Sequence, residues 1–374
     1  MRVRPLRVPT RLTVARVAPT VARVAPTVAR AGRVAVGLFG RAKGEVVHPL
    51  EGVDAVLADL DGVVYQGAGA IPFAVDALNR VAAEGLRVGY ITNNASRTDA
   101  QVAGHLSEFG LAVAAEDVVT SPQAAMRVMR TLIEPGSTVL VVGGVGLSSE
   151  VEKAGFVVTR SAEDAPAAVV QGFAPEVGWT QLAEAAFALH DPAVQWVATN
   201  TDWTIPVARG IAPGNGTLVS AVHTAVGRLP VVAGKPETTI FEVAAERFSA
   251  QNAAFIGDRL DTDTLGAKRA GLRAIHVLTG IDRAKQLLAA PKDSRPDFIL
   301  DDLRQLFEPY PVARTSKDGV ETTVGSSVVT MKGHVVRVEK AGDRPVDLLR
   351  AGCAAIWGSG KSIHVLDVDP ALYS

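Results

Sequence analysis

The sequence Val53-Asp54-Ala55-Val56-Leu57-Ala58-Asp59-Leu60-Asp61-Gly62 sets the architecture of this chain. Its first six residues form a mostly apolar run, which predicts a buried strand. Two carboxylates two residues apart follow at once, and Gly62 predicts a turn. One carboxylate at such a strand end can attack phosphorus while the other handles the proton of the leaving oxygen. The pattern is typical of two-step phosphoryl transfer, provided that the rest of such a site follows.

Strand and helix patterns alternate on either side of this run. A helix predicted over residues 72–84 has Pro72 in its first turn and is closed by Gly85. Such alternation predicts an α/β fold whose core, residues 45–120 and 235–310, is a Rossmann-like, doubly wound parallel sheet. Further strands are expected at 86–91, 253–256, 273–277 and 298–300, and further helices at 95–109, 240–248, 262–270 and 303–307.

Residues 121–234 separate the two halves of this core. The segment is far too long for a loop and has apolar patterns of its own. It therefore predicts an inserted second α/β domain, with strands at 138–142, 167–170 and 196–199.

The pattern changes again beyond Pro311. Residues 321–330 and 333–339 alternate polar and apolar side chains, which predicts a β-hairpin. Residues 346–357 are predicted to be a helix. Residues 311–374 are therefore expected to form a small αβ appendage.

Composition and charge limit the functional classes. Apolar residues make up 48% of the chain and charged residues 21%, as in soluble globular proteins, and there is no run of 18 apolar residues to favour stable membrane insertion. Residues 1–44 carry a charge of +10, so the net charge of −1 leaves −11 on residues 45–374. Such an acidic body is not expected to bind nucleic acid. The single Cys353 excludes an internal disulfide and fits a cytoplasmic protein.

The N-terminus repeats the unit Val14-Ala-Arg-Val-Ala-Pro-Thr20. A proline in every unit would interrupt a helix, and Val and Ala alone cannot build a core. Residues 1–44 are therefore expected to be a disordered Arg-rich tail, or to lie upstream of the true start of translation. A transit peptide and a tether to an anionic surface are alternatives that the composition allows.

Four polar elements follow predicted strands, where open α/β sheets bind ligands. They are the pair Asp59 and Asp61, then Thr92, then Lys235 between Gly234 and Pro236, and the acidic segment 257–263. Each has an ordinary alternative, since Asp forms turns and caps helices and Lys is often a solvated loop residue. Together they supply a nucleophile, an acid, a hydrogen-bond donor to phosphate, a cation and metal-binding carboxylates, which favours a phosphoryl-transfer site.

The order of these motifs resembles the haloacid dehalogenase superfamily of phosphatases, and more narrowly its pyridoxal phosphatase-like branch with a large α/β cap. The resemblance covers about residues 50–308. It rests on DLDGVVY at 59–65, ITNN at 91–94, ATNTD at 198–202, PGNG at 213–216, GKP at 234–236 and GDRLDTD at 257–263. It implies a Mg²⁺-dependent phosphatase with residues 121–234 as its cap.

The resemblance also implies individual roles. Asp59 would attack the phosphate to give an aspartyl-phosphate, and Asp61 would protonate the leaving alkoxide and then activate water. Thr92 and the Asn93 amide would hold phosphate oxygens beside the Lys235 cation. The implied Mg²⁺ site consists of Asp59, the Asp61 carbonyl and Asp258, oriented by Asp263, and such ligands suit this ion.

The cap is expected to select the substrate. The implied substrate-binding residues are Asn93, Asn94, Asn200, Asp202, Gly214, Asn215 and Gly216. The glycine-rich turn at 213–216 is expected to donate backbone N–H groups to a substrate hydroxyl, with a plain turn as the alternative.

The appendage resembles the tail of actinobacterial glycerol 3-phosphate phosphatases, a fragment of an acetyltransferase fold. Arg350-Ala-Gly352 does not match a coenzyme A loop, so packing or homo-oligomerisation is expected rather than acetyl transfer. The segment 358–362 lacks the glycine that a phosphate loop needs, because Ala355 takes its place.

The expected substrate is a small phosphomonoester. Glycerol 3-phosphate comes first, with phosphoglycolate, pyridoxal 5′-phosphate and nucleoside monophosphates as alternatives. A catalytically silent sensor of phosphorylated metabolites is the alternative from a different class.

Overall fold

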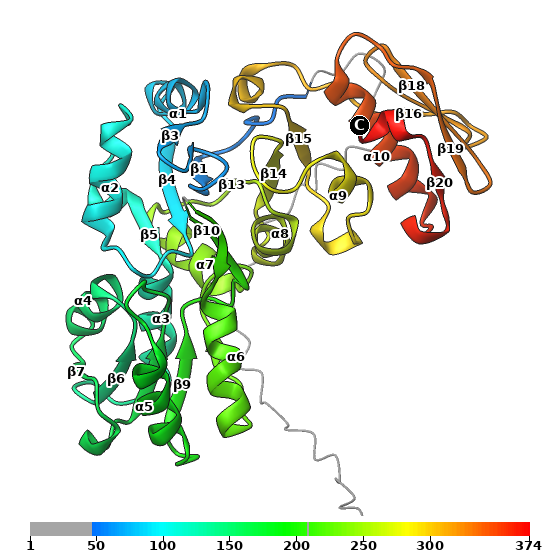
Figure 1. The fold of residues 1–374 in the computed structure, drawn as a ribbon. Coiled ribbons are helices and arrows are strands. Elements are labelled where there is room, and N and C mark those ends of the chain that lie inside the picture. Colours follow the sequence, from blue (N-terminus) through cyan, green and yellow to red (C-terminus); the bar gives the residue numbers. More distant parts are fainter. Residues whose placement is uncertain (1–46, 208) are drawn as a thin grey trace, which may run out of the picture. The chain divides into compact units, whose positions relative to one another are not determined.

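The computed structural model describes residues 47–207 and 209–374, so the tail predicted at 1–44 lies outside the described residues. Its central element is a six-stranded parallel sheet with the order β15-β14-β13-β1-β4-β5 (Figure 1). The strands are β1 (Ala55–Ala58), β4 (Arg87–Thr92), β5 (Val118–Thr120), β13 (Ala253–Gly257), β14 (Arg273–Val277) and β15 (Phe298–Leu300). Strand β1 pairs with β4 on one side and with β13 on the other, so distant parts of the chain meet beside Asp59.

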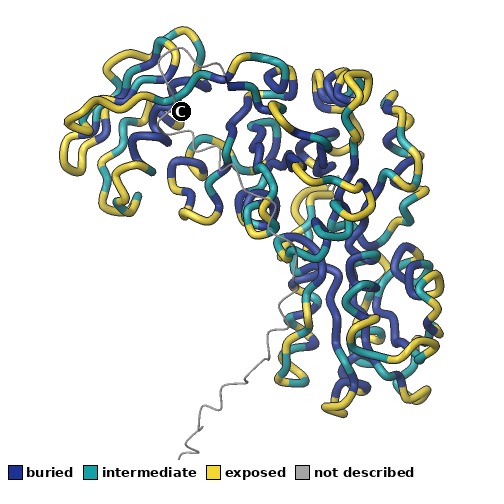
Figure 2. Tube along the Cα trace, turned by 180° about the vertical axis from the view of Figure 1, so that it is seen from behind, coloured by how far each residue is buried: buried dark blue, intermediate teal, exposed yellow. Residues whose placement is uncertain are grey.

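Both faces of this sheet are covered, as its apolar strands require. Along β1, Val56 and Ala58 belong to one hydrophobic cluster, together with residues of α1 and α2. Ala55 and Leu57 belong to a second cluster, with residues of α3, α7 and α8. These helices are α1 (Ala74–Ala83), α2 (Asp99–Glu108), α3 (Ser121–Met129), α7 (Thr238–Arg247) and α8 (Leu265–Ala270). Figure 2 shows the strands buried and the outer helix faces exposed.

The inserted segment contains a second parallel sheet, of order β12-β9-β8-β6-β7. Its strands are β6 (Thr138–Val142), β7 (Val157–Thr159), β8 (Ala168–Gln171), β9 (Gln195–Ala198) and β12 (Val231–Val232). Its helices are α3, which also packs against the core, and α4 (Val145–Lys153), α5 (Trp179–Leu189) and α6 (Asn215–Val226). A separate hairpin is formed by β10 (Thr204–Val207) and β11 (Gly210–Pro213). The predicted α/β class, with a parallel sheet core and an inserted α/β unit, is confirmed.

The C-terminal appendage is a five-stranded sheet rather than the predicted simple hairpin. Residues 321–330 do not form one strand, because Gly325 has φ 56° and the chain turns there. The strands are β16 (Arg314–Thr315), β17 (Glu321–Val324), β18 (Ser327–Lys332), β19 (Val335–Lys340) and β20 (Asp367–Val368), and the helices near them are α9 (Ala284–Leu288) and α10 (Pro345–Ser359). Buried Arg350 in α10 pairs with Asp347 and donates to the carbonyl of Ile299, which ties α10 to the core sheet.

Two predicted helices differ in detail. Residues 260–264 form a π-helical segment that leads into α8, and residues 303–307 form a 3₁₀ helix. A small flap, β2 (Tyr65–Gln66) with β3 (Gly69–Ala70), follows the Asp59–Gly62 turn. In the part of the chain that the structure describes, every helix is too short or too polar to cross a membrane.

Candidate active site

Three residues from distant motifs meet in a buried ionic cluster. Asp59 directly follows β1, Lys235 follows β12, and Asp263 lies in the π-helical segment after β13. Lys235 Nζ lies 2.6 Å from Asp59 Oδ1 and 2.7 Å from Asp263 Oδ1. Asp59, the predicted nucleophile, is 8% exposed and Lys235 is 3% exposed. Asp59 and Asp263 follow strands of the core sheet, whose carboxyl ends share one edge, as the sequence motifs predicted. Lys235 reaches the same point from β12 of the second sheet.

The electrostatics of this cluster are dominated by burial and by the excess of carboxylates. Burial raises the pKa of Asp59 well above its usual range, and the charge of Asp263 raises it further, while Lys235 opposes both. Burial alone would lower the pKa of Lys235, but the charges of Asp263 and Asp59 outweigh it and raise that pKa. Lys235 is therefore a permanent cation at the nucleophile.

Asp258 supplies a carboxylate with an open coordination position. Its Oδ2 accepts a hydrogen bond of 2.7 Å from the Ile281 N–H. Its Oδ1 is buried and has no hydrogen-bond partner within the described part of the chain. Burial, and next to it the charge of Asp263, raise the pKa of Asp258 to about 7.

The carboxylates fit the Mg²⁺ ion that the motifs predict. One oxygen from each of Asp59, Asp258 and Asp263 lies within 4.8 Å of the others. Among the described residues, Lys235 pairs with Asp59 and Asp263 but not with Asp258, whose buried Oδ1 has no hydrogen-bond donor. Hard oxygen ligands of this kind suit Mg²⁺, and its charge would relieve the repulsion that raises their pKa values.

Asp263 is held in place by the loop that carries it. Its Oδ2 accepts hydrogen bonds of 3.1 Å from the N–H groups of both Asp258 and Arg259. Its Oδ1 pairs with Lys235. Both oxygens are thus engaged, which suits the orienting role expected for Asp263 better than direct coordination.

Two glycines shape this site: Gly62, which the sequence predicted as a turn, and Gly280, which the sequence analysis missed. A Cβ atom on Gly280 would lie 1.9 Å from Asp258 Oδ2, and one on Gly62 would lie 2.3 Å from it. The two glycine loops are joined, because the Thr279 hydroxyl donates to the Gly62 carbonyl over 2.7 Å. The position of Thr279-Gly280 just beyond β14 matches that of the other strand-end motifs and was the available signal.

Asp61 and Thr92 lie at the ends of β1 and β4. The Tyr65 hydroxyl, also missed, donates to Asp61 Oδ2 over 3.2 Å. Asp61 is exposed, yet the protein packed around its carboxyl raises its pKa. The Asp61 carboxylate is not part of the three-carboxylate cluster, and coordination through its carbonyl stays a prediction. Thr92 is buried, and its Oγ1 accepts from the Asn94 N–H over 3.0 Å.

The side chain of Asn93 is engaged by other residues of the protein. Its Nδ2 donates to both carboxylate oxygens of Asp202 (3.1 and 3.2 Å) and to the Lys235 carbonyl. Its Oδ1 accepts from the Lys235 N–H over 2.9 Å. Any phosphate contact must come from its backbone N–H. Asn94 is also locally engaged, because its Oδ1 accepts from the Ser96 N–H over 2.9 Å.

Residues of the ATNTD and PGNG motifs are joined by hydrogen bonds. Asn200 Nδ2 donates to the Asn93 carbonyl over 2.8 Å, and Asn200 Oδ1 accepts from the Asp202 N–H over 3.1 Å. Asn215 Nδ2 donates to the Asn200 carbonyl over 2.7 Å. These contacts fix Asp202 opposite Asn93.

The glycine-rich turn differs from the prediction. The N–H groups of Gly214 and Gly216 donate to the carbonyls of Trp203 and Asp202, each over 2.9 Å, and so are not free for a substrate hydroxyl. A Cβ atom on Gly216 would lie 2.3 Å from the Thr201 carbonyl oxygen. The glycines permit close backbone packing beneath Asp202, so the turn is a support for the loop rather than a donor to substrate.

Comparisons with known proteins agree with this geometry. The haloacid dehalogenase-like hydrolase family matches residues 56–157, and a second model, described as HAD-hydrolase-like, matches residues 232–306. The D-glycerol 3-phosphate phosphatase of Mycobacterium tuberculosis is 41% identical over 81% of this chain and 86% of its own length. The acid sugar phosphatase of Staphylococcus aureus is 32% identical over 67% of this chain and 95% of its own length.

A solved structure extends the comparison. The crystal structure of a glycerol phosphate phosphatase from M. tuberculosis in complex with magnesium has a TM-score of 0.77 and 38% identity, covering 84% of this chain and 93% of that chain. Its similarity extends beyond residues 56–306, the outer limits of the two family matches. On these findings, the chain belongs to the haloacid dehalogenase-like hydrolases.

Proposed function

We propose that this chain is a Mg²⁺-dependent phosphatase of small phosphomonoesters, with glycerol 3-phosphate as its substrate. The observation that carries the phosphatase assignment is the buried cluster in which Lys235 contacts Asp59 beside the unpartnered Asp258 oxygen. A sensor of phosphorylated metabolites would have no need to retain a nucleophile, an acid and a metal-binding carboxylate together.

The reaction takes place in two steps. A carboxylate oxygen of Asp59 attacks phosphorus, the bond to the ester oxygen breaks, and Asp61 gives its proton to the leaving alkoxide. Asp61, now ionised, takes a proton from a water molecule, which attacks the aspartyl-phosphate and releases phosphate and free Asp59. The raised pKa of Asp61 favours the protonated form that the first step needs.

The remaining groups hold charge and position. Lys235 keeps its charge and neutralises the nucleophile and the incoming phosphate. Thr92, with the backbone N–H of Asn93, holds phosphate oxygens at the end of β4. Mg²⁺, held by Asp59, Asp258 and the Asp61 carbonyl and oriented by Asp263, would supply further positive charge to the phosphate oxygens.

The inserted residues 121–234 act as the cap that selects the alcohol part of the substrate. The Asn93–Asp202 contact seats this cap on the core. Glycerol 3-phosphate is favoured because the relative with 41% identity is named for it and because similarity to the M. tuberculosis structure covers 84% of the chain. The cytoplasmic location, the absence of nucleic-acid binding and a homo-oligomeric state stay predictions.

A phosphate-release screen tests the proposal. The purified protein is assayed with Mg²⁺ against both enantiomers of glycerol 3-phosphate, phosphoglycolate, pyridoxal 5′-phosphate, a nucleoside monophosphate and a hexose phosphate. One glycerol 3-phosphate enantiomer should give a kcat/KM at least about tenfold above the other compounds, a difference that one or two polar contacts can provide. An equal kcat/KM for phosphoglycolate would overturn the substrate assignment. No phosphate release from any compound would overturn the assignment as a phosphatase.

A further inference from the structure

A cavity of about 340 Å³ lies among α3, α4 and α7, away from the catalytic cluster. It is lined by charged side chains of both signs: Arg127, Arg130, Lys153, Arg247, Glu150 and Glu246. Four cations thus face two carboxylates, whereas residues 45–374 as a whole carry a net charge of −11. This cavity is a basic site on an acidic protein.

Two of the four cations already have carboxylate partners. Arg127 forms a bidentate pair with Glu246, at 2.5 and 2.8 Å. Lys153 in α4 lies 2.6 Å from Glu150 and 3.3 Å from Asp99 of α2. Among the described residues, these pairs use three carboxylates and leave Arg130 and Arg247 without an ion-pair partner.

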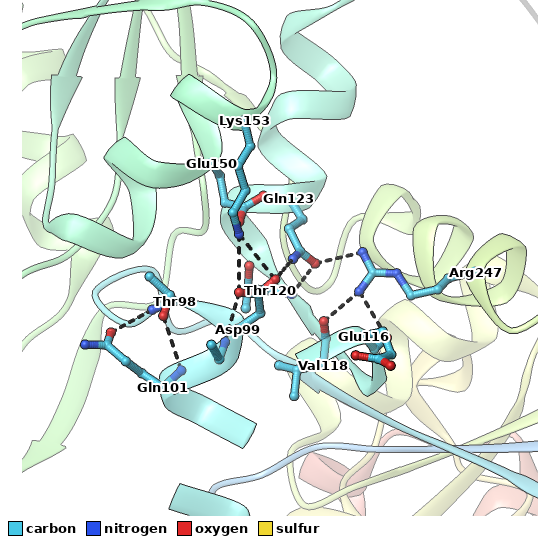
Figure 3. Close-up of polar contacts among 11 residues, drawn as sticks. Thr98, Asp99, Gln101, Glu116, Val118, Thr120, Gln123, Glu150, Lys153 and Arg247 are labelled. Carbon is cyan, nitrogen blue, oxygen red and sulfur yellow. Dashed lines mark hydrogen bonds and ion pairs between the residues drawn. The ribbon is translucent and has the colours of Figure 1, made fainter. Parts of the chain in front are cut away.

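Arg247 and Arg130 carry the excess positive charge. Arg247 donates to the Val118 carbonyl over 2.7 Å and to Gln123 Oε1 over 2.9 Å, which are neutral acceptors (Figure 3). Among residues 47–207 and 209–374, no carboxylate forms an ion pair with Arg130, which is exposed at the end of α3. Two guanidinium groups at one cavity thus lack a bonded counter-charge.

Hydrogen bonds hold the side chains of the cavity wall in place. Gln123 Nε2 donates to Asp99 Oδ2 over 3.0 Å while its Oε1 accepts from Arg247, so Gln123 links the guanidinium of Arg247 to Asp99 (Figure 3). Met126 and Val243 provide apolar lining between the charges. Guanidinium groups beside an apolar wall suit an organic anion with two negative groups, because Arg binds phosphate and carboxylate oxygens in pairs.

We propose that this cavity is a second binding site, which takes a small organic dianion through Arg130 and Arg247. Helices α3 and α4 belong to the inserted segment and α7 to the core, so a bound dianion contacts both parts of the enzyme. The ligand class is a small phosphorylated or dicarboxylate metabolite, two chemistries that share paired oxyanions and differ in geometry.

Isothermal titration at constant ionic strength tests the site directly. Sulfate represents the tetrahedral dianion and succinate the dicarboxylate, and both are titrated into the full chain without Mg²⁺, where the carboxylate-rich catalytic cluster disfavours anions. Wild type should bind at least one of the two probes at one site, and the probe that binds more tightly identifies the ligand geometry. Failure of both probes to bind would overturn the proposal.

Three variants locate the binding. Arg130→Gln and Arg247→Gln should each weaken the bound probe by about tenfold or more, the loss expected for one charge-assisted contact. Arg314→Gln removes an exposed arginine of β16 and should bind like wild type. Arg247 donates to the Val118 carbonyl, so the fold of the Arg247→Gln variant is checked by circular dichroism. Arg130 is exposed, so the Arg130→Gln variant is the decisive one. Binding by Arg130→Gln equal to that of Arg314→Gln would overturn the proposal, whichever substrate the catalytic site takes.

Discussion

Lys235 Nζ lies 2.6 Å from Asp59 Oδ1, and the two side chains are only 4% and 11% exposed. Lys235 also pairs with Asp263 on its other side, so one ammonium group compensates two buried carboxylates. In an ion pair this deeply buried, the attraction between the charges offsets the cost of removing them from water. Removing any one member therefore has consequences that depend on which charge is left behind.

Replacing the nucleophile should abolish turnover without unfolding the protein. Asp59→Asn removes the attacking oxygen but can keep a hydrogen bond to Lys235, so kcat should fall by at least about 1,000-fold. Phosphate release is measured with Mg²⁺, and circular dichroism checks the fold. Turnover close to that of wild type would exclude Asp59 as the nucleophile.

Removing the cation should destabilise the fold. Lys235→Met leaves Asp59 and Asp263 buried without their counter-charge, which should lower the free energy of unfolding by about 3–5 kcal/mol. Urea denaturation in EDTA measures it. Lys285→Met changes an exposed lysine of α9 and should stay within about 0.5 kcal/mol of wild type. Equal stability of the two variants would contradict the buried-cluster account.

The stability of the metal-free protein should depend on pH through the titration of Asp258. Burial and Asp263 raise its folded pKa to about 7, above the value of about 3.9 in an unfolded chain. Protonation of Asp258 therefore stabilises the fold fully below about pH 4, and this contribution is lost as the pH rises through about 7. The pKa of Asp59 is raised in the same direction.

Mg²⁺ binding should show the opposite trend, because the ion needs ionised carboxylates. Its affinity is expected to rise from about pH 6 to about pH 8, with release of protons on binding. Titration calorimetry in buffers of different ionisation enthalpy measures both quantities. An affinity that is flat over this interval would show that Asp258 is already ionised in the metal-free protein.

The sequence was sufficient to predict which motifs meet, but not how each side chain is used. Asp59 and Asp258 could be predicted to converge because each follows a strand of the core parallel sheet, whereas Lys235 follows β12 of the second sheet and was grouped with them by the order of the motifs. The partner of the Asn93 side chain could not be predicted, because a side-chain amide can bond to many groups and the actual one, Asp202, is 109 positions away in the chain. Such contacts depend on how the inserted segment packs on the core, which residue type alone does not specify.

The appendage shows a second limit of sequence reasoning. The turn between β17 and β18 falls at Gly325-Ser326, a two-residue turn signal that the prediction of one alternating strand over residues 321–330 overlooked. Gly280 was missed for a different reason: a single glycine after a strand does not reveal which side chain will approach it.

The Asn93–Asp202 contact should affect catalysis more than stability. Asp202→Ala removes the carboxylate that receives the Asn93 amide, so the cap is less well seated and kcat/KM should fall between about 10- and 100-fold. Asp202→Asn keeps an acceptor oxygen and should recover part of the loss. Glu176→Ala, at an exposed cap position, is the matched control and should be active. A wild-type kcat/KM for Asp202→Ala would mean that this contact does not seat the cap.

Gly280→Ala should disrupt the metal site while leaving the polar residues unchanged. The added Cβ would lie 1.9 Å from Asp258 Oδ2 and 2.4 Å from Asp258 Cβ, so the carboxylate cannot avoid it by a small rotation and must give up its bond to the Ile281 N–H. Mg²⁺ affinity, measured by titration calorimetry, should fall by about 10- to 100-fold, as when a supporting contact of a metal ligand is lost. Gly104→Ala in α2 is the control, because its Cβ would meet no atom within 4 Å and should stabilise the helix by up to about 1 kcal/mol. If Gly280→Ala bound Mg²⁺ as tightly as Gly104→Ala, Asp258 would not be the ligand that this loop positions.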